Sequence, residues 1–396
     1  MSAVLPLSRR RQVRPDLALD YGLLACVLGL LGLGLVMVAS ASMPLSERIY
    51  HDPFHFLVRH VIALSLALSA GFAAYWVPTV WWQRARTALL ALGVVLLILV
   101  LIPGLGYTAN GATRWIPLGP FKLQSSEFMK LFAIIYVSGY LVRHREAVTG
   151  SVAGFLRPMV LMGLVSALIM AEPDFGTMAV MMATVLGLLF LGGVQARHFI
   201  VLATLVTLAL AALIAIEPYR VERVLSFLNP FEDAFDTGYQ LSQALIAFGR
   251  GEWFGVGLGN GIQKQFFLPE PHTDFIAAVV GEELGLVGVL AIVAAFAFIT
   301  WRAFVIGARA FADEQRFAAF LAYGIGLSLG LQAFVNLGVN IGVLPTKGLT
   351  LPFLSYGSNS LIVACLAIGV LLRIDSDQRR RAREAGPEKG LRWVRA

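Results

Sequence analysis

Runs of about 20 predominantly apolar residues recur along this chain, from Leu17 to the region of Leu372. A helix of that length crosses roughly 30 Å of hydrocarbon. The chain is 58% hydrophobic and only 14% charged, whereas soluble domains carry about 25% charged residues. A soluble core could not bury this much apolar surface, so the sequence predicts an all-α integral membrane protein.

The apolar runs predict about ten transmembrane helices in one membrane domain, residues 19–373. Residues 1–18 and 374–396 form basic tails on either side of it. An even number of spans places both termini on one side of the membrane. The expected spans begin near Leu19, Leu57, Ala85, Glu127, Leu156, Gly176, His198, Asp274, Arg316 and Phe353.

Arginine residues gather in the two tails and in alternate connections between the spans. The net charge is +7, and most of the excess lies in the tails. Beside a membrane span, such charge marks the cytoplasmic face more often than a nucleic-acid site. We therefore expect cytoplasmic termini, contact with membrane lipid and no nucleic-acid partner. The connections on this side carry Arg84, Arg86, Arg143, Arg145, Arg157, Arg197, Arg302 and Arg309.

The longest polar segments face the other side, where we expect the function. A large extracytoplasmic loop, residues 218–273, connects spans seven and eight. In it Leu241, Leu245 and Phe248 share one helical face, an amphipathic pattern that can lie in the membrane interface. The other outward segments are residues 44–56, 104–126, 172–175 and 345–352.

Asp274 follows His272 and Thr273 at the point where the long loop enters an apolar span. A carboxylate at this outer boundary is a candidate general base. The alternative is that Thr273 or Asp274 caps the helix by accepting bonds from its first backbone N–H groups. Capping and catalysis are compatible roles.

Two further pairs of charged residues are candidates for binding. Glu127 and Lys130 are three residues apart, so they share a helix face and can form an ion pair inside a partly dry cavity. The alternative is that Glu127 caps the start of the helix and forms only a surface pair with Lys130. Glu282 and Glu283 lie where each charge costs at least roughly 2.5 kcal/mol. Such residues usually face a polar cavity or carry a proton. The alternative is that one glutamate is protonated and hydrogen-bonds a neighbouring helix.

Two arginines lie in segments suited to phosphate recognition. Arg114 stands beside Trp115 at the outer interface, where a guanidinium can bind phosphate and the indole can anchor in lipid. Arg250 lies in a glycine-rich segment, residues 249–261, whose backbone amides could cradle phosphate oxygens. The alternative is a merely flexible loop.

Metal and disulfide chemistry have little support in the sequence. The six histidines form no zinc-binding spacing, and both cysteines, Cys26 and Cys365, lie inside apolar runs. The residues that would hold a metal are therefore unknown.

Several ordered motifs together resemble those of the SEDS family, over nearly the whole chain from the first span. The most specific are Gly238-Tyr239-Gln240, Gly257-Leu258-Gly259 and the run from Leu344 to Pro352, which includes Lys347. Ser125 stands where the family usually has proline, and Ser358 and Asn359 replace the usual glycine and serine. The matching segments are residues 110–116, 124–130, 172–177, 218–223, 229–230, 238–261, 272–275 and 345–356.

The resemblance implies a peptidoglycan glycosyltransferase that polymerises lipid II, an undecaprenyl-pyrophosphate-linked disaccharide-pentapeptide, at the division septum of the bacterial cytoplasmic (inner) membrane. It implies a class B penicillin-binding transpeptidase (FtsI-like) as partner, with further division proteins that are FtsQ-, FtsL-, FtsB- and FtsN-like. The family's essential acid matches Asp274, and its paired acid and lysine match Glu127 and Lys130.

The α-linked donor and β-linked product require an inverting attack, for which Asp274 would be the base. Lys130 is the first choice for stabilising the departing pyrophosphate, followed by Arg114, Arg250 or a divalent cation, Mg²⁺ or Mn²⁺. Glu282, Glu283, His272 and Lys347 are candidates of a second rank. Two alternatives remain: a lipid II transporter (flippase), or a non-enzymatic division scaffold.

Overall fold

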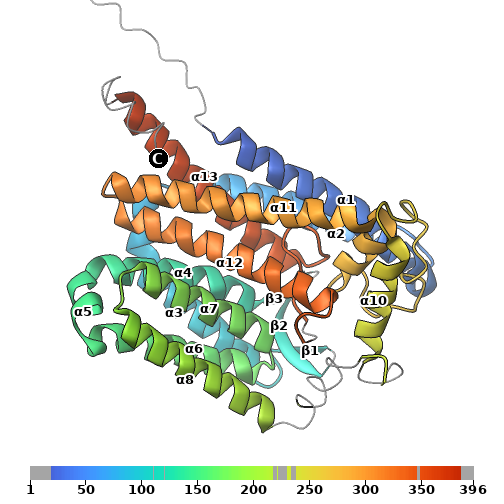
Figure 1. Cartoon of the computed structure of the whole chain (residues 1–396), viewed down its shortest axis with the longest axis horizontal. Helices are drawn as coiled ribbons and strands as arrows, with labels where there is room; N and C mark the ends of the chain where they lie inside the picture. Colours follow the sequence, from blue (N-terminus) through green and yellow to red (C-terminus); the bar gives the residue numbers. More distant parts are fainter. Residues whose placement is uncertain are drawn as a thin grey trace, which may run out of the picture.

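The computed structural model describes residues 19–109, 111–119, 121–216, 221, 230–232, 238–345 and 348–384. It confirms a mostly helical protein with a small sheet (Figure 1). The helices are α1 (Tyr21–Tyr50), α2 (His55–Trp76), α3 (Thr79–Leu101), α4 (Ser125–Arg143), α5 (Arg145–Gly150), α6 (Val152–Ala171), α7 (Phe175–Leu191), α8 (Ala196–Ala215), α10 (Tyr239–Gly251), α11 (Ile276–Ala312), α12 (Arg316–Asn340) and α13 (Ser358–Glu384).

A helix lies at each of the ten expected spans. Seven helices in the described ranges are long and apolar enough to cross a membrane, which supports a multi-pass membrane protein. The count of ten crossings and the cytoplasmic termini stay predictions. The seven are α1, α2, α3, α6, α11, α12 and α13, and α7 is a shorter apolar helix.

Two helices begin five or six residues away from the span starts expected near them. The helix expected from Ala85 begins at Thr79, so the polar and aromatic residues before Ala85 are helical too. The helix expected from Phe353 begins only at Ser358. The preceding segment is non-helical but buried, and an added Cβ at Gly34 of α1 would lie 2.4 Å from the Phe353 carbonyl oxygen. Gly34 thus lets α1 approach this backbone closely.

A three-stranded antiparallel sheet, which the sequence did not predict, precedes α4. Its strands are β1 (Tyr107–Ala109), β2 (Ala112–Leu118) and β3 (Phe121–Gln124), in that order. Gly119 adopts φ +63° between β2 and β3, a left-handed conformation that glycine adopts at little cost. The Asn359 side chain donates to the Lys122 carbonyl oxygen at 2.8 Å, which ties the sheet to the start of α13.

Helix α11 is broken at Gly285, where φ is +69° and ψ is −167°. The segment after α10 packs into this break: Leu286 N–H donates to the Glu252 carbonyl oxygen at 2.9 Å, and Val287 N–H to that of Trp253 at 3.1 Å. An added Cβ at Gly285 would lie 2.4 Å from the Gly255 nitrogen. The break therefore anchors the end of the long loop.

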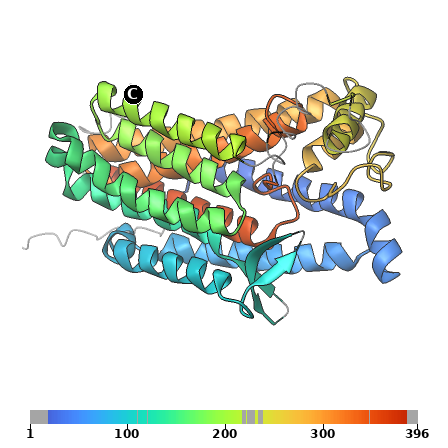
Figure 2. The same cartoon turned by 90° about the horizontal axis from the view of Figure 1, so that it is seen from below.

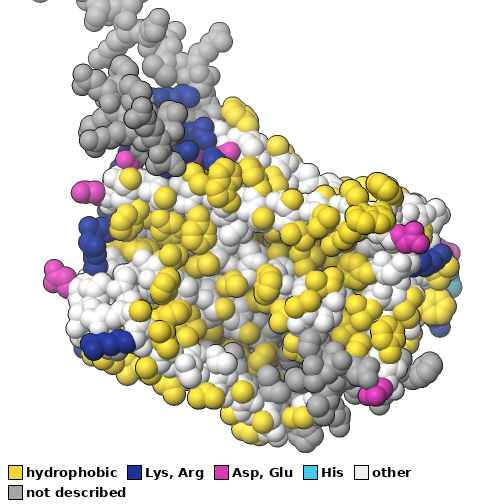
Figure 3. Space-filling model, in the orientation of Figure 1, with side chains coloured by type: hydrophobic (Ala, Val, Ile, Leu, Met, Phe, Trp, Pro, Cys, Tyr) yellow, Lys and Arg dark blue, Asp and Glu magenta, His cyan; other side chains and the backbone are white. Residues whose placement is uncertain are grey.

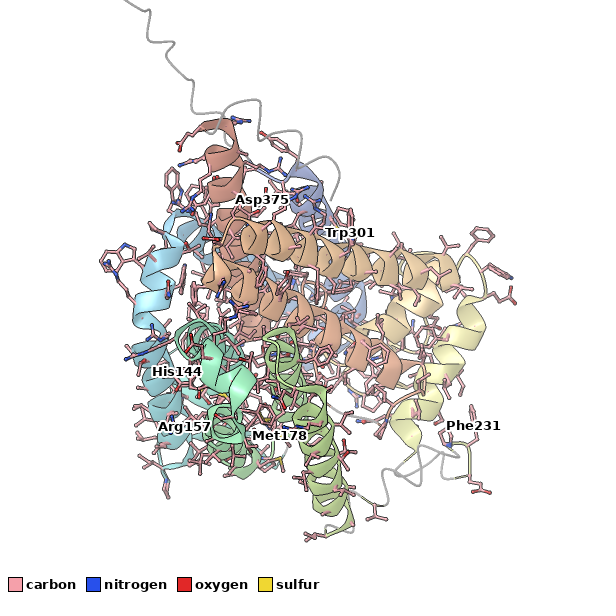
Figure 4. The ribbon with its side chains drawn as sticks, turned by 60° about the vertical axis from the view of Figure 1, so that its left-hand side comes forward. His144, Arg157, Met178, Phe231, Trp301 and Asp375 are labelled. Carbon is pink, nitrogen blue, oxygen red and sulfur yellow. The ribbon has the colours of Figure 1, made fainter. Side chains whose placement is uncertain are left out.

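The bundle has two chemically different ends. The sheet and α10 lie at one end, and α5 and the end of α13 lie at the other (Figures 1 and 2). Lysine and arginine side chains gather at the second end, while hydrophobic side chains cover the middle of the visible face (Figure 3). His144 and Arg157 lie on the opposite side of the view from Phe231 (Figure 4). The gathering of basic side chains at one end agrees with the charge pattern of the sequence, and the assignment of that end to the cytoplasm stays a prediction.

Candidate active site at the sheet end of the bundle

Asp274 lies just before α11 and is held in place by two amides of α12. The side chains of Asn336 and Asn340 each donate to its carbonyl oxygen at 3.0 Å. Asn340 also accepts from Ala278 N–H at 3.2 Å, which fixes α12 against the first turn of α11. The Asp274 backbone is therefore rigidly positioned, while its carboxylate accepts no hydrogen bond from the described residues.

The capping alternative for Thr273 and Asp274 was wrong. Helix α11 has Phe275 at its N-cap, and no side chain bonds the first backbone N–H groups. The Thr273 hydroxyl donates instead to the Glu270 carboxylate at 2.9 Å. The Asp274 carboxylate is thus left available for another role.

The surroundings of Asp274 suit a base that works near neutral pH. Burial raises the pKa of Asp274 to about 7, and the nearby Glu270 and Asp174 carboxylates also raise it, while the Arg114 charge lowers it. A base is most effective when its pKa is close to the working pH. A Cβ added at Gly348 would lie 3.0 Å from Asp274 Oδ2, so a glycine keeps the space beside the carboxylate open.

Arg114 reaches from β2 to the turn between α6 and α7. Its Nε donates to the Glu172 carbonyl oxygen at 3.1 Å, and a terminal nitrogen donates to the Pro173 carbonyl oxygen. Its charge acts on Asp274 and on the Glu172 carboxylate. Arg114 is half-buried, and its contact with the Pro173 carbonyl oxygen is exposed.

Glu172 and Asp174 are two acids of this site that sequence reasoning did not select. Ser125, one of the departures from the family pattern, donates to the Glu172 carboxylate at 3.0 Å. Burial raises the pKa of Glu172 to about 8, and the Asp174 charge also raises it. Asp174 caps α7 and accepts from Ser126 at 2.8 Å. The sequence did contain a signal for these two residues, because two acids lie within a four-residue turn that faces outward.

Glu127 and Lys130 form the expected ion pair, with Nζ 3.0 Å from Glu127 Oε2, and both side chains are about 95% buried. The alternative of a surface pair was therefore wrong. Lys130 also donates to Gln332 at 2.6 Å. The pair lines a small cavity of about 20 Å³, which has room for about one water molecule.

An amide ladder on α12 connects this pair with Asp274. Gln332, Asn336 and Asn340 are spaced by four residues and share one helix face. Gln332 donates to the Thr350 carbonyl oxygen at 3.0 Å, and Asn336 to that of Leu349 at 2.5 Å. Three amides at this spacing within an apolar helix were a signal that the sequence contained.

Glu282 and Glu283 are fully buried and bind the glycine-rich loop. Glu282 pairs with Arg250 at 2.8 Å and accepts from Ile262 N–H at 2.9 Å. Glu283 pairs with Lys264 at 2.5 Å and accepts from Gly259 N–H at 3.0 Å.

In this second cluster the glycine-rich segment is arranged differently from the phosphate-binding loop that we expected. Backbone amides of the glycine-rich segment donate to protein carboxylates, and Arg250 forms an ion pair with Glu282. The structure thus brings Arg250, Glu282 and Glu283 together, but in a cluster of their own at the break in α11.

His272 is buried, and its ring lies 5.0 Å from that of Phe56 and 5.5 Å from that of Tyr356, between centroids. Burial lowers the pKa of His272, which favours the neutral imidazole at pH 7. Lys347 lies outside the described residues. Its neighbour Gly348 lies beside Asp274.

No three His, Cys, Asp or Glu side chains within the described ranges are placed to hold a metal ion. Of the acids whose charges act on Asp274, Glu270 accepts from the Thr273 hydroxyl. Asp174 accepts from the Ser126 hydroxyl and from the Thr177 N–H. The expected Mg²⁺ or Mn²⁺ ion stays a prediction.

Known proteins resemble this chain over nearly its full length. It is 60% identical over 391 residues to a probable peptidoglycan glycosyltransferase FtsW of Allochromatium vinosum, which covers 99% of this chain and 98% of that protein. It is 49% identical over 387 residues to that of Thioalkalivibrio sulfidiphilus, covering 98% and 96%.

Solved structures of the same fold agree with this similarity. A chain of a peptidoglycan synthase complex superposes with a TM-score of 0.75 at 29% identity, covering 91% of this chain and 98% of that chain. The rod shape determining protein RodA of Thermus thermophilus gives a TM-score of 0.68 at 28% identity, covering 92% and 99%. The family model for FtsW, RodA and SpoVE, described as cell cycle protein, matches residues 21–380. The chain therefore belongs to the FtsW/RodA/SpoVE family of cell cycle proteins, the SEDS family that its motifs resemble.

Proposed function

We propose that this protein is a peptidoglycan glycosyltransferase that polymerises lipid II, with Asp274 as the general base. The observation that carries the proposal is the environment of Asp274, whose backbone carbonyl oxygen accepts hydrogen bonds from two side-chain amides. Its carboxylate is free of hydrogen bonds from the described residues and has a pKa of about 7. The names of its close relatives support the same activity.

The reaction is a single displacement with inversion. The acceptor sugar's hydroxyl oxygen forms a bond to the anomeric carbon of the donor as Asp274 takes the hydroxyl proton. The bond between that carbon and the pyrophosphate oxygen breaks, and the lipid pyrophosphate leaves with the electron pair. A positioned base contributes about a hundred- to ten-thousandfold in rate.

Arg114 is better placed than Lys130 to stabilise the leaving pyrophosphate. The charge of Arg114 acts on Asp274, and the contact of Arg114 with the Pro173 carbonyl oxygen is exposed. Lys130 is almost fully buried and is bound by Glu127 and Gln332. We therefore assign the first electrostatic contact with the pyrophosphate to Arg114, and a supporting role in the amide ladder to Lys130.

The proposed setting is the septum of the bacterial cytoplasmic membrane, with a class B penicillin-binding transpeptidase as partner. The solved neighbour that belongs to a synthase coordinating polymerisation and crosslinking supports such a pairing. Binding of FtsQ-, FtsL-, FtsB- and FtsN-like proteins is part of the same proposal and rests on the family alone.

The transporter alternative is less favoured by the geometry. A carrier of lipid II needs a large polar passage that opens to both sides. The buried Glu127–Lys130 pair lines a cavity of only about 20 Å³. The groups around Asp274 lie instead at the sheet end of the bundle.

The test uses purified protein and fluorescently labelled lipid II, alone and with the division transpeptidase. Glycan ladders on a gel, with β-linkages confirmed by NMR, are expected for the native protein. Asp274→Ala should give no ladder while keeping the same elution volume and melting temperature. Ladders from Asp274→Ala would overturn the assignment of the base, and no product from the native protein with its partner would overturn the activity.

A further inference from the structure

An arginine-lined cavity lies at the end of the bundle opposite Asp274, between the last turns of α11 and α13. Its volume is about 250 Å³, close to the lower end of small-molecule pockets, roughly 300 to 1,000 Å³. Three arginines and one aspartate give it an excess of two positive charges. The lining residues are Arg309, Asp375, Gln378, Arg379, Ala382 and Arg383.

The polar side chains of this cavity are held in position. Asp375 is fully buried, and its Oδ2 accepts from Arg379 Nε at 2.5 Å. Arg309 lies 3.9 Å from the other carboxylate oxygen. Gln378 is also buried and donates to the Ile306 carbonyl oxygen at 3.0 Å. The cavity is therefore a built site, and a single carboxylate does not satisfy its three guanidinium groups.

Two buried acceptors in the cavity show what else the ligand must offer. Asp375 Oδ1 and Gln378 Oε1 are buried but accept no hydrogen bond from the described residues. A buried acceptor without a donor is costly. A ligand that combines an anionic group for the arginines with hydroxyl donors for these two oxygens would satisfy both needs.

The surroundings favour a lipid over an anion from solution. The cavity lies between two helices that are apolar enough to span a membrane. Phe311, two residues from Arg309, is 44% exposed, and Trp301 of the same helix is 56% exposed. Exposed tryptophan is typical of the membrane interface. Asp375 and Trp301 both lie toward the upper part of Figure 4.

We infer that this cavity binds the headgroup of an anionic phospholipid that carries free hydroxyl groups, such as phosphatidylglycerol. The phosphate binds Arg309, Arg379 and Arg383, and the headgroup hydroxyls donate to Asp375 and Gln378. Basic pockets between membrane helices commonly bind lipid phosphates in this way. The inference does not depend on the glycosyltransferase mechanism.

The experiment titrates lipids into the purified full-length protein in detergent and counts bound lipids by native mass spectrometry. The test variant is Arg309→Gln with Arg383→Gln, which leaves the Arg379–Asp375 pair intact. The matched control is Arg145→Gln with Arg380→Gln, which removes the same charge from exposed positions outside the cavity. Melting temperatures of both variants verify folding.

We expect one phosphatidylglycerol to bind more tightly than phosphatidic acid, which lacks the headgroup hydroxyls, and far more tightly than phosphatidylcholine. The test variant should lose at least roughly tenfold in affinity, and the control should not. Equal loss in the control, or equal binding of phosphatidylcholine, would overturn the inference. Stabilisation by inorganic phosphate equal to that by phosphatidylglycerol would show an anion site without lipid selectivity, which also contradicts it.

Discussion

The side-chain amide of Asn336 donates to the carbonyl oxygen of Asp274 at 3.0 Å. The same nitrogen lies 2.5 Å from the Leu349 carbonyl oxygen. One residue of α12 thus joins the start of α11 to the segment that passes beside the Asp274 carboxylate. The position of the proposed base is set by a helix that is distant from it in sequence.

Replacing Asn336 with leucine should reduce polymerisation at least about tenfold. The Leu349 carbonyl oxygen would lose the Asn336 donor, at a cost of about 1 to 3 kcal/mol. The Asp274 carbonyl oxygen would keep only Asn340 as donor, so Asp274 would be less well held. The measurement is the rate of lipid II consumption by purified protein. Thr184→Ala is the control, because that buried hydroxyl donates only within its own helix; an equal loss there would contradict the positioning role.

The pH dependence of polymerisation should follow Asp274. Its pKa of about 7 means that the rate rises as pH increases through about 7 and levels off above it, because the base must be ionised. Glu270→Gln removes a charge that raises this pKa, so the midpoint should move to lower pH. Arg114→Gln should move it to higher pH. Unchanged midpoints in both variants would argue against Asp274 as the titrating group.

Because of Glu172, the free energy of unfolding should fall as the pH becomes alkaline. Its pKa is raised from 4.5 to about 8 in the folded state, so the folded state binds the proton more tightly than the unfolded state. The resulting stability is present below about pH 4.5 and is lost as pH rises through about 8. Glu172→Gln should flatten the melting temperature between pH 5 and 9. A variant with the native pH dependence would exclude Glu172 as its source.

Variants of the buried Glu127–Lys130 pair can distinguish a structural role of Lys130 from a direct role in the reaction. Lys130→Met alone leaves Glu127 buried without its partner and should cost about 3 to 5 kcal/mol. The double variant Glu127→Leu with Lys130→Met should recover most of that stability. We expect the double variant to retain measurable polymerisation when assayed with labelled lipid II. If it is folded but inactive, Lys130 acts directly on the substrate.

The break in α11 should tolerate no side chain at Gly285. Gly285→Ala places a Cβ 2.4 Å from the Gly255 nitrogen at φ +69°, so the loop must shift. We expect a clearly lower melting temperature. Gly32→Ala in α1, where an added Cβ meets nothing within 4 Å, is the control and should melt like the native protein or slightly above it.

Most helices could be predicted because apolar length alone signals a membrane helix. The Glu127–Lys130 pair was also predictable, since three-residue spacing fixes a shared helix face. The sheet before α4 was missed because its short strands lie in an outward segment without a strong alternating pattern. The binding of Glu282 and Glu283 to the glycine-rich loop depends on the break at Gly285. Local sequence does not show which carboxylates the loop amides will meet.

The contact between Asn336 and Asp274 could not be predicted from the sequence for a similar reason. The four-residue spacing of Gln332, Asn336 and Asn340 shows that they share a face of α12. It does not show which neighbour that face meets. Arg114 likewise joins Asp274 only through the pairing of β2 and the turn at Glu172, which are contacts between distant parts of the chain.

The most direct measurement is the rate of glycan formation from saturating lipid II by Asp274→Asn protein, beside Glu270→Gln as a nearby acid that should not be the base. We predict a loss of about a hundred- to ten-thousandfold for Asp274→Asn and a loss of less than about tenfold for Glu270→Gln at pH 8. A folded Asp274→Asn protein that polymerises lipid II at the native rate would contradict the role of Asp274.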